Sequence, residues 1–225
     1  MPKYEYVLKN EYRPVREELE RIIKKAQRIL RKKTGITFQF ELIGSGSKHL
    51  ITRIKGGNKG FDFDYNLILN CNPGYHWKPD YARIQVTNAI DKAIEGTEYG
   101  HPQNSKVALT IKVKDTTKSR IIHSCDFAVV YYPDPNSNEH EYVRLDLKTN
   151  KYTWETRAYT KEYHKDLDWL KDNVPGYWEM IKEEYLKLKE NNNDPNKCSF
   201  QLFYEVVKNV RNNVSIKNRV SSLLF

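Results

Sequence analysis

Long apolar runs, an apolar N-terminus and paired cysteines are missing from this sequence, and each absence excludes a class of protein. No stretch approaches the roughly 20 apolar residues of a membrane span, so we expect no membrane partner. The N-terminal segment MPKYEYVLKNEYRP is charged throughout and lacks the apolar region of a signal peptide. The three cysteines, Cys71, Cys125 and Cys198, are odd in number, widely scattered and without zinc-site spacing. They predict reduced thiols in the cytoplasm.

The composition favours a folded, soluble protein with an anionic partner. Of the 225 residues, 39% are apolar and 12% aromatic, which suffices for a core in one large domain or two small ones. The formal net charge is +9, from 38 lysines and arginines against 29 aspartates and glutamates. This balance favours nucleoside triphosphates or a polynucleotide as partners. A lysine-rich, well-solvated surface explains the same charge equally well.

The period of the apolar residues changes along the chain. Alternation over two residues predicts strands at residues 36–43, 61–69, 107–113, 120–132, 141–147 and 151–154. Spacing of three and four residues predicts helices at residues 14–33, 79–94 and 166–173, with further helical stripes between residues 178 and 210. The change from strands to helices falls near residues 157–162. We therefore expect an α+β protein with a mixed-sheet core over residues 1–160 and a C-terminal helical lobe over residues 161–225.

Residues 44–70, GSGSKHLITRIKGGNKGFDFDYNLILN, carry the strongest chemical signal. They open on a Gly-Ser-Gly-Ser turn and end in a predicted strand that contains Asp62 and Asp64. Two aspartates at this spacing point to the same face of a strand, where they repel each other unless a cation lies between them. A hard ion such as Mg²⁺ binds one or two carboxylates together with substrate phosphates. The turn adds backbone N–H groups that favour an anion such as a triphosphate.

A third carboxylate, Asp126, lies within the apolar stretch RIIHSCDFAVVYY of residues 120–132. A lone aspartate in such a run is expensive to bury unless it is paired or bound to metal. Two explanations remain open: Asp126 is a third metal ligand, or it is a structural aspartate that caps a turn or pairs with Arg120. His123 and Cys125 flank it, and we expect both to pack in the core.

The glycine-serine turn, the D-x-D strand and the later lone aspartate occur in this order on a strand-turn-helix-strand frame. Together they resemble the nucleotidyltransferase superfamily typified by DNA polymerase beta, and most of all its oligoadenylate-synthase and cyclic GMP-AMP synthase branch. The resemblance implies a mixed-sheet nucleotidyltransferase core with flanking helices. It also implies transfer of a nucleoside monophosphate from an NTP to an acceptor hydroxyl, with release of pyrophosphate.

The resemblance assigns roles to particular residues. Asp62, Asp64 and Asp126 would be the catalytic residues and would hold two Mg²⁺ or Mn²⁺ ions. Ser47 would contact the β- or γ-phosphate, and Gly46 would let the chain approach the triphosphate closely. Lys48 and His49 follow the turn and would add charge, although a simple exposed role is equally consistent.

The helical part of the chain resembles the same branch more loosely. There, a helix bearing a lysine precedes a serine at the head of another helix, and both touch the triphosphate. Lys187 and Ser199 stand in that order here. Lys182 and Lys189 compete with Lys187 for this role, and Ser199 is equally explained as a helix N-cap. The chain is short beside a cyclic-dinucleotide synthase, so we expect a reduced acceptor-binding surface.

The sequence leaves the acceptor open. RNA or tRNA, a second nucleotide, a protein side chain and a small molecule all remain, and the basic charge favours RNA or nucleotides. A non-catalytic nucleic-acid-binding protein with the same fold is the main alternative. The three aspartates argue against it, because carboxylates that face phosphates without metal would repel them. A metal-dependent nuclease ranks lower, since the Gly-Ser turn has no necessary part in its mechanism. The sequence also leaves open whether a partner protein restrains the enzyme.

Overall fold

The computed structural model describes residues 2–70, 77–133, 139–158, 162–194 and 197–223. The chain divides into two compact units. The sheet unit comprises Tyr6–Tyr159, and the helical unit comprises Met1–Glu5 and Thr160–Phe225. Cys71 lies outside the described residues, whereas Cys125 and Cys198 are free cysteines.

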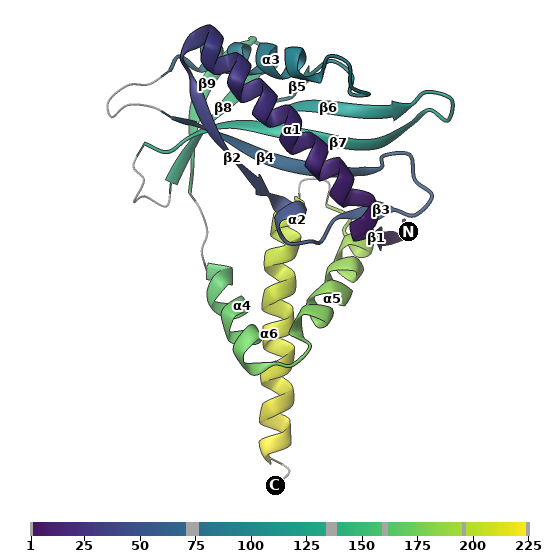
Figure 1. The fold of residues 1–225 in the computed structure, drawn as a ribbon. Helices are drawn as coiled ribbons and strands as arrows, with labels where there is room; N and C mark the ends of the chain where they lie inside the picture. The colour runs from purple at the N-terminus through teal and green to yellow at the C-terminus, as the bar shows by residue number, and fades with distance from the viewer. Residues whose placement is uncertain (1, 71–76, 134–138, 159–161, 195–196, 224–225) are drawn as a thin grey trace. The chain divides into compact units, whose positions relative to one another are not determined.

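A mixed seven-stranded sheet forms the centre of the sheet unit (Figure 1). Its strands, in spatial order, are β2 (Thr37–Ile43), β4 (Phe61–Asn70), β7 (Arg120–Tyr131), β6 (Ala108–Asp115) and β5 (Gln103–Asn104), with β8 (Glu139–Asp146) paired to β7 and β9 (Lys151–Ala158) paired to β8. The β4–β7 pair is parallel, and the other pairs of this sheet are antiparallel. Two short strands, β1 (Tyr4–Tyr6) and β3 (Thr52–Ile54), form a second sheet. The predicted α+β class with a mixed sheet is confirmed.

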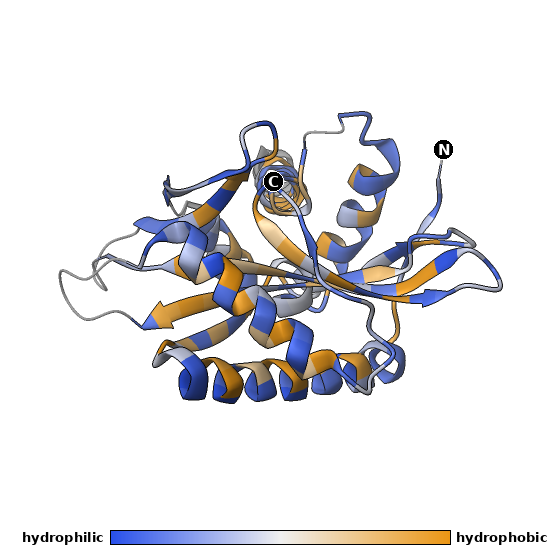
Figure 2. Ribbon diagram, turned by 90° about the horizontal axis from the view of Figure 1, so that it is seen from above, coloured by the Kyte–Doolittle hydropathy of each residue, from blue (hydrophilic) through white to orange (hydrophobic). Residues whose placement is uncertain are grey.

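Helices α1 (Lys9–Thr34) and α3 (Pro79–Ile94) cover one face of the large sheet (Figure 1). The ribbon of α1 alternates between hydrophobic and hydrophilic bands (Figure 2), as expected for a helix with one buried stripe. Odd-numbered residues of β4 and β7 point toward these helices, because successive strand residues face opposite sides. They form one core with the buried residues of both helices, including Leu19, Ile23, Phe63, Val86, Ile90 and Phe127.

Helix α1 begins at Lys9, so the predicted start at Pro14 is wrong. Proline is favoured at the first helical position, but here it lies inside the helix, where it removes one backbone hydrogen bond. Tyr12 stabilises the additional helical turn before Pro14. Its ring is buried and packs edge-on against Phe63, with ring centroids 6.4 Å apart. The Tyr12 hydroxyl also lies 3.0 Å from Nδ1 of His49. The predicted end is confirmed: Gly35 adopts a left-handed φ of 76° and its N–H bonds to Arg31.

The strand-turn-helix-strand frame predicted that a helix starts after the glycine-serine turn, and the structure differs. Helix α2 (Gly44–Ser47) consists of the four turn residues alone. The N–H of Leu50 donates to the carbonyl of Ser45 at 2.9 Å, and His49 adopts a φ of 55°, so the chain leaves the helix at once. It then continues into β3, a strand that the sequence did not predict.

The helical unit contains α4 (Glu162–Asn173), α5 (Tyr177–Asn191) and α6 (Ser199–Leu223). The predicted helical stripes form its core: Ile181 and Tyr185 of α5 are buried, as are Phe203, Val206, Val207 and Val210 of α6. Pro175 separates α4 from α5, as predicted, and Gly176 enters α5 with a left-handed φ of 73°. Among the described residues, no helix combines the length and the apolar character needed to cross a membrane.

His123 and Cys125 point into the core from β7, which confirms their predicted packing role. His123 is 6% exposed, stacks on Tyr99 and meets Phe61 edge-on. Its Nδ1 and the Tyr99 hydroxyl are buried without a hydrogen-bond partner among the described residues. Burial therefore lowers the pKa of His123 to about 4.

We predict that His123→Phe flattens the acid dependence of stability. A histidine whose pKa is lower in the folded state stabilises the fold above its unfolded pKa, near 6.5. That stability is lost as the pH falls from about 6.5 through 4, because the buried ring must be protonated. Phenylalanine keeps the ring contacts and carries no proton. Urea unfolding at several pH values should show the wild type weakening relative to the variant over this window, and parallel profiles would contradict the account.

Candidate functional site

The three aspartates lie on one face of the large sheet, opposite the face that α1 and α3 cover. Asp62 and Asp64 are alternate residues of β4 and share this face, with Asp62 exposed and Asp64 half-buried. Asp126 of β7 is the direct cross-strand partner of Asp64. We name this side of the sheet the carboxylate face.

The strand registers align the residues of the carboxylate face in rows across the sheet. The first row runs from β2 to β5 and contains Ile43, Asp64, Asp126, Thr110 and Gln103. The second row contains Asp62, Ser124 and Lys112. Since neighbouring strands lie about 4.8 Å apart, each row brings together side chains that are far apart in the sequence.

Asp126 is held by the neighbouring strand. Its carboxylate accepts a hydrogen bond of 2.5 Å from the hydroxyl of Thr110 on β6. The alternative partner, Arg120, pairs instead with Asp115 at 3.2 Å. Asp126 is thus a carboxylate of the site face with a neutral partner, rather than half of the ion pair that one explanation required.

The three carboxylates place negative charge on the same region of the sheet. Burial raises the pKa of the Cys125 thiol, and the charges of Asp126, Asp64 and Asp62 raise it further. Cys125 lies on β7 beside Asp126, with its side chain on the core side. The negative charges of all three carboxylates therefore raise the pKa of the same thiol, which lies on the opposite face of the sheet.

The glycine-serine turn lies against this cluster. Gly44 has a left-handed φ of 62°, and a Cβ atom there would lie 2.8 Å from Oδ2 of Asp64. A bare glycine is needed at this position for both reasons. Gly46 is buried, and a Cβ there would lie 2.9 Å from Leu42 and 3.2 Å from Phe63, so its small size lets the turn pack on the sheet. Ser47 is exposed, and its hydroxyl donates to the carbonyl of Gly44 at 3.0 Å.

The carboxylates fit a hard divalent cation by donor type and by backbone position. Carboxylate oxygens are the ligands that Mg²⁺ prefers, and Asp64 and Asp126 are cross-strand neighbours with Asp62 one pleat away. Across the described residues, however, no three acidic, histidine or cysteine side chains converge on a single point. The Asp126 carboxylate accepts its hydrogen bond from Thr110 on the β6 side.

Lys187 and Ser199 belong to the helical unit. Lys187 is exposed on α5, and Ser199 is the first residue of α6. The cap of α6 is formed by neighbouring residues, since the N–H of Cys198 bonds to Gln201 and its carbonyl accepts from Leu202. The contacts of Lys187 and Ser199 with a triphosphate stay a prediction.

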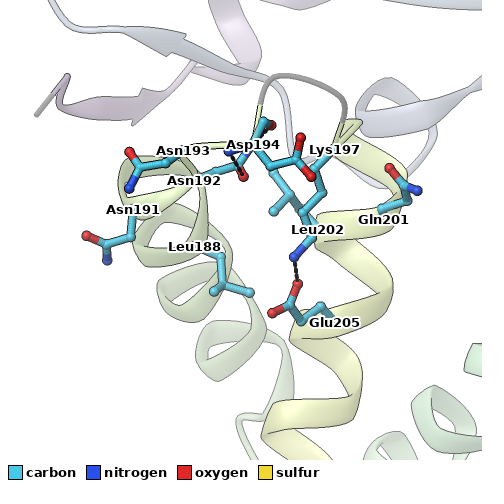
Figure 3. Close-up of a pocket in the computed structure, with 9 residues that line it drawn as sticks. All are labelled: Leu188, Asn191, Asn192, Asn193, Asp194, Lys197, Gln201, Leu202 and Glu205. Carbon is cyan, nitrogen blue, oxygen red and sulfur yellow. Dashed lines mark hydrogen bonds and ion pairs between the residues drawn. The ribbon is translucent and has the colours of Figure 1, made fainter.

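A hollow of about 500 Å³ lies between the end of α5 and the start of α6 (Figure 3). Its lysine, Lys197, forms an ion pair with Glu205 across the hollow. Asp194 also lines it. With one lysine against two carboxylates, the lining carries a net negative charge and does not favour a triphosphate.

The sequence interpretation missed Thr110 and Lys112, which the structure adds to the carboxylate face. Both are the polar positions of the otherwise apolar strand VALTIKV, so alternation assigns them to the side away from the core. At the turn between β6 and β7, Asp115 is paired with Arg120. If this register continued unchanged along the two strands, Asp126 would be paired with Leu109, whose side chain is in the core. A bulge between Val113 and Lys114 shifts the register by one residue and restores Thr110 to the position opposite Asp126.

This arrangement defines a class of protein by its fold. The chain shares the fold of solved nucleotidyltransferase structures, among them a cyclic AMP-GMP synthase described as a prokaryotic cGAS homologue. The resemblance inferred from the sequence is confirmed at the level of fold. No family model matches the sequence, and no curated protein is detectably similar to it in sequence.

Two solved enzymes illustrate the likeness. The cyclic AMP-GMP synthase DncV of Vibrio cholerae, in complex with the linear intermediate 5′ pppA(3′,5′)pG, aligns with 91% of this chain and 67% of its own, at a TM-score of 0.63 and 12% identity. The CD-NTase CdnG of Bradyrhizobium diazoefficiens, in complex with GTP, aligns with 71% of this chain at a TM-score of 0.50 and 14% identity. The present chain spans 42% of the CdnG chain. At these identities the likeness concerns the fold alone.

We predict that Thr110→Val destabilises the protein through Asp126. Valine has the shape of threonine without the hydroxyl, so the carboxylate loses its hydrogen bond. A hydrogen bond to a charged group contributes about 1.5–3 kcal/mol, and we expect the lower end because both side chains are half-buried. Thr110→Ser keeps a hydroxyl and serves as the control in urea unfolding. Equal stability of the two variants would show that the bond contributes nothing.

We predict that Gly44→Ala is more destabilising than Gly35→Ala. Both glycines have a left-handed φ, which costs a residue with a Cβ about 1–2 kcal/mol. At Gly35 no atom lies within 4 Å of the added Cβ, whereas at Gly44 it meets the Asp64 carboxylate. The excess loss of unfolding free energy should disappear when Gly44→Ala is combined with Asp64→Ala. An excess that persists in the double variant would place the clash elsewhere.

Proposed function

We propose that the protein is a metal-dependent nucleotidyltransferase that moves a nucleoside monophosphate from an NTP to an acceptor hydroxyl and releases pyrophosphate. The observation that supports this most is the cross-strand pairing of Asp64 with Asp126 beside the glycine-serine turn. It brings an acidic cluster and a candidate anion site together. A nuclease would need the acids but not the turn, and a binding protein would need neither.

In this reaction the acceptor hydroxyl oxygen forms a bond to the α-phosphorus, and the bond from that phosphorus to the pyrophosphate oxygen breaks. The hydroxyl proton leaves to solvent or to a carboxylate of the cluster. Pyrophosphate departs on the side opposite the attacking oxygen. The protein's own task is to hold the two reactants in line, since phosphoryl transfer asks for little covalent chemistry from side chains.

Asp62, Asp64 and Asp126 would hold the divalent ions, in agreement with their donor chemistry. When bound, Mg²⁺ or Mn²⁺ would lower the pKa of the acceptor hydroxyl and stabilise the charge on the leaving pyrophosphate. Thr110 would orient the Asp126 carboxylate through its hydroxyl. Gly44 would leave room for the Asp64 carboxylate at the edge of the turn.

The triphosphate of the donor would lie at the glycine-serine turn, where Ser47 is exposed and Gly46 keeps the turn close to the sheet. We propose residues 1–160 as the catalytic core. Residues 161–225 would then supply a second set of phosphate contacts through Lys187 and Ser199. A triphosphate carries several negative charges, so contacts beyond the metal ions would stabilise it further.

A nucleotide is favoured as the acceptor over RNA or tRNA. The intermediate in complex with DncV, 5′ pppA(3′,5′)pG, joins one nucleotide to another. CdnG was solved in complex with GTP. The present chain shares their fold, and these ligands support nucleoside triphosphates as its donor and its acceptor.

The decisive experiment incubates the protein with each labelled NTP and Mg²⁺ or Mn²⁺, singly and in pairs, with and without total RNA. Release of pyrophosphate together with a new labelled species would identify donor and acceptor. Binding of RNA without any product would favour the non-catalytic alternative. Shortening of the RNA without use of an NTP would favour a nuclease.

We predict that Asp64→Asn and Ser47→Ala impair the reaction in different ways. Loss of the Asp64 carboxylate should lower the rate by more than about 100-fold, because charge stabilisation in the transition state is the largest single contribution to such catalysis. Loss of the Ser47 hydroxyl removes one phosphate contact of about 1.5 kcal/mol and should raise the KM for NTP about tenfold. Steady-state kinetics would measure both effects, with exposed Asp80→Asn as a control. Equal and complete loss in both variants would refute this division of roles.

A further inference from the structure

Lys112 is a cation on the carboxylate face for which the proposed chemistry has not yet assigned a role. It lies on β6 in the second row, opposite Ser124, which is in turn opposite Asp62. Its side chain is half-buried, whereas Lys114 and Lys118 of the same hairpin are exposed. The bulge at Val113 and Lys114 keeps Lys112 on this face. In the two rows Lys112 is the residue that carries a positive charge.

Within the part of the chain that the structure describes, no carboxylate forms an ion pair with Lys112. Its Nζ donates to the amide oxygen of Gln103 at 3.2 Å, and Gln103 is neutral. By contrast, Lys92 and Lys182 lie against carboxylates, those of Glu95 and Glu179. A half-buried ammonium group held by an amide is available to an anion.

In the proposed reaction the acceptor attacks from the side opposite the leaving pyrophosphate, and Lys112 lies on that side. This step rests on the proposed function. The turn lies at the β2 side of Asp64, so the triphosphate and its leaving pyrophosphate belong there. In-line displacement requires the attacking oxygen to arrive from the opposite side, which is the side of β7 and β6. Lys112 lies two strands from Asp62, roughly 10 Å away, and its long flexible stem reaches part of that distance.

We propose that Lys112, oriented by Gln103, binds a phosphate group of the acceptor, and that the acceptor is a free nucleotide. One half-buried lysine matches one phosphate group. A polynucleotide would call for several cations along a groove. The adjacent positions in the rows on either side add no second cation: Thr110 and Gln103 lie in the first row, and Ala108 and Ala128 in the next one.

The test uses a donor that cannot accept and acceptors that cannot donate. The donor is a labelled mixture of the four 2′,3′-dideoxy-NTPs, which lack both acceptor hydroxyls. The acceptors are the four nucleosides in one arm and the four α,β-methylene NTPs in the other, since the methylene group blocks their own transfer. Total RNA forms a third arm. The full-length protein is used, and the labelled product is separated by chromatography.

With the phosphate-bearing acceptors, Lys112→Gln should raise the acceptor KM by about tenfold or more, as expected for loss of a contact to a charged group. The nucleoside arm and the KM for the donor should stay within about twofold of the wild type, a change of only about 0.4 kcal/mol. Lys112→Arg should restore most of the loss, because arginine also binds phosphate. Lys118→Gln removes the same charge from the turn of the same hairpin and should behave as the wild type.

The outcomes separate this inference from the proposed function. Absence of transfer by the wild type in every arm, and with the natural NTPs, would overturn both. Transfer by the wild type with an unchanged acceptor KM in Lys112→Gln would overturn the role of Lys112 alone. Transfer to RNA but not to the α,β-methylene NTPs would overturn the free nucleotide as acceptor. An equal loss in the nucleoside and nucleotide arms would show a structural effect in place of a phosphate contact.

Discussion

The parallel pairing of β4 with β7 is the constraint on which the candidate site depends. Two residues that are distant in the sequence, Asp64 and Asp126, become neighbours only in this register. The register is fixed by the odd-numbered apolar residues of both strands, which α1 and α3 bury. A slip of one residue would move Asp126 into the core and Cys125 onto the carboxylate face. The burial of Phe63 and Phe127 therefore positions the acids as effectively as any polar contact.

Much of this arrangement follows from the sequence because its causes are periodic. Alternation over two residues assigns Asp62 and Asp64 to one face, and the isolation of Asp126 among apolar residues marks it as unusual. Gly35 ends α1 for a local reason, its left-handed backbone. Local propensity fails where distant contacts decide. Pro14 suggested the start of α1, yet the packing of Tyr12 on Phe63 stabilises an earlier turn.

The contribution of β6 was harder to predict, and the reason lies in the register of the hairpin. The turn alone would pair Asp126 with Leu109 and so expose an apolar side chain on the carboxylate face. The bulge at Val113 and Lys114 removes this conflict, since it lets the odd-numbered residues of both strands reach the core. The alternation of apolar and polar residues on β6 and β7 thus requires a one-residue shift in their pairing register, and the residues of the turn do not predict it. Thr110 reaches Asp126 as a consequence of core packing.

Electrostatics link these features to the proposed activity. The chain carries a formal net charge of +9, yet it gathers three carboxylates on one patch of its sheet, where like charges repel. A stable fold does not need this cluster, because threonine or asparagine at these three positions would preserve the same alternation of apolar and polar residues. The hydrogen bond from Thr110 stabilises the Asp126 carboxylate, and Lys112 lies in the row of Asp62. In the proposed enzyme a bound cation would reduce the repulsion among these carboxylates, so the cluster would favour the metal-bound state over the metal-free one.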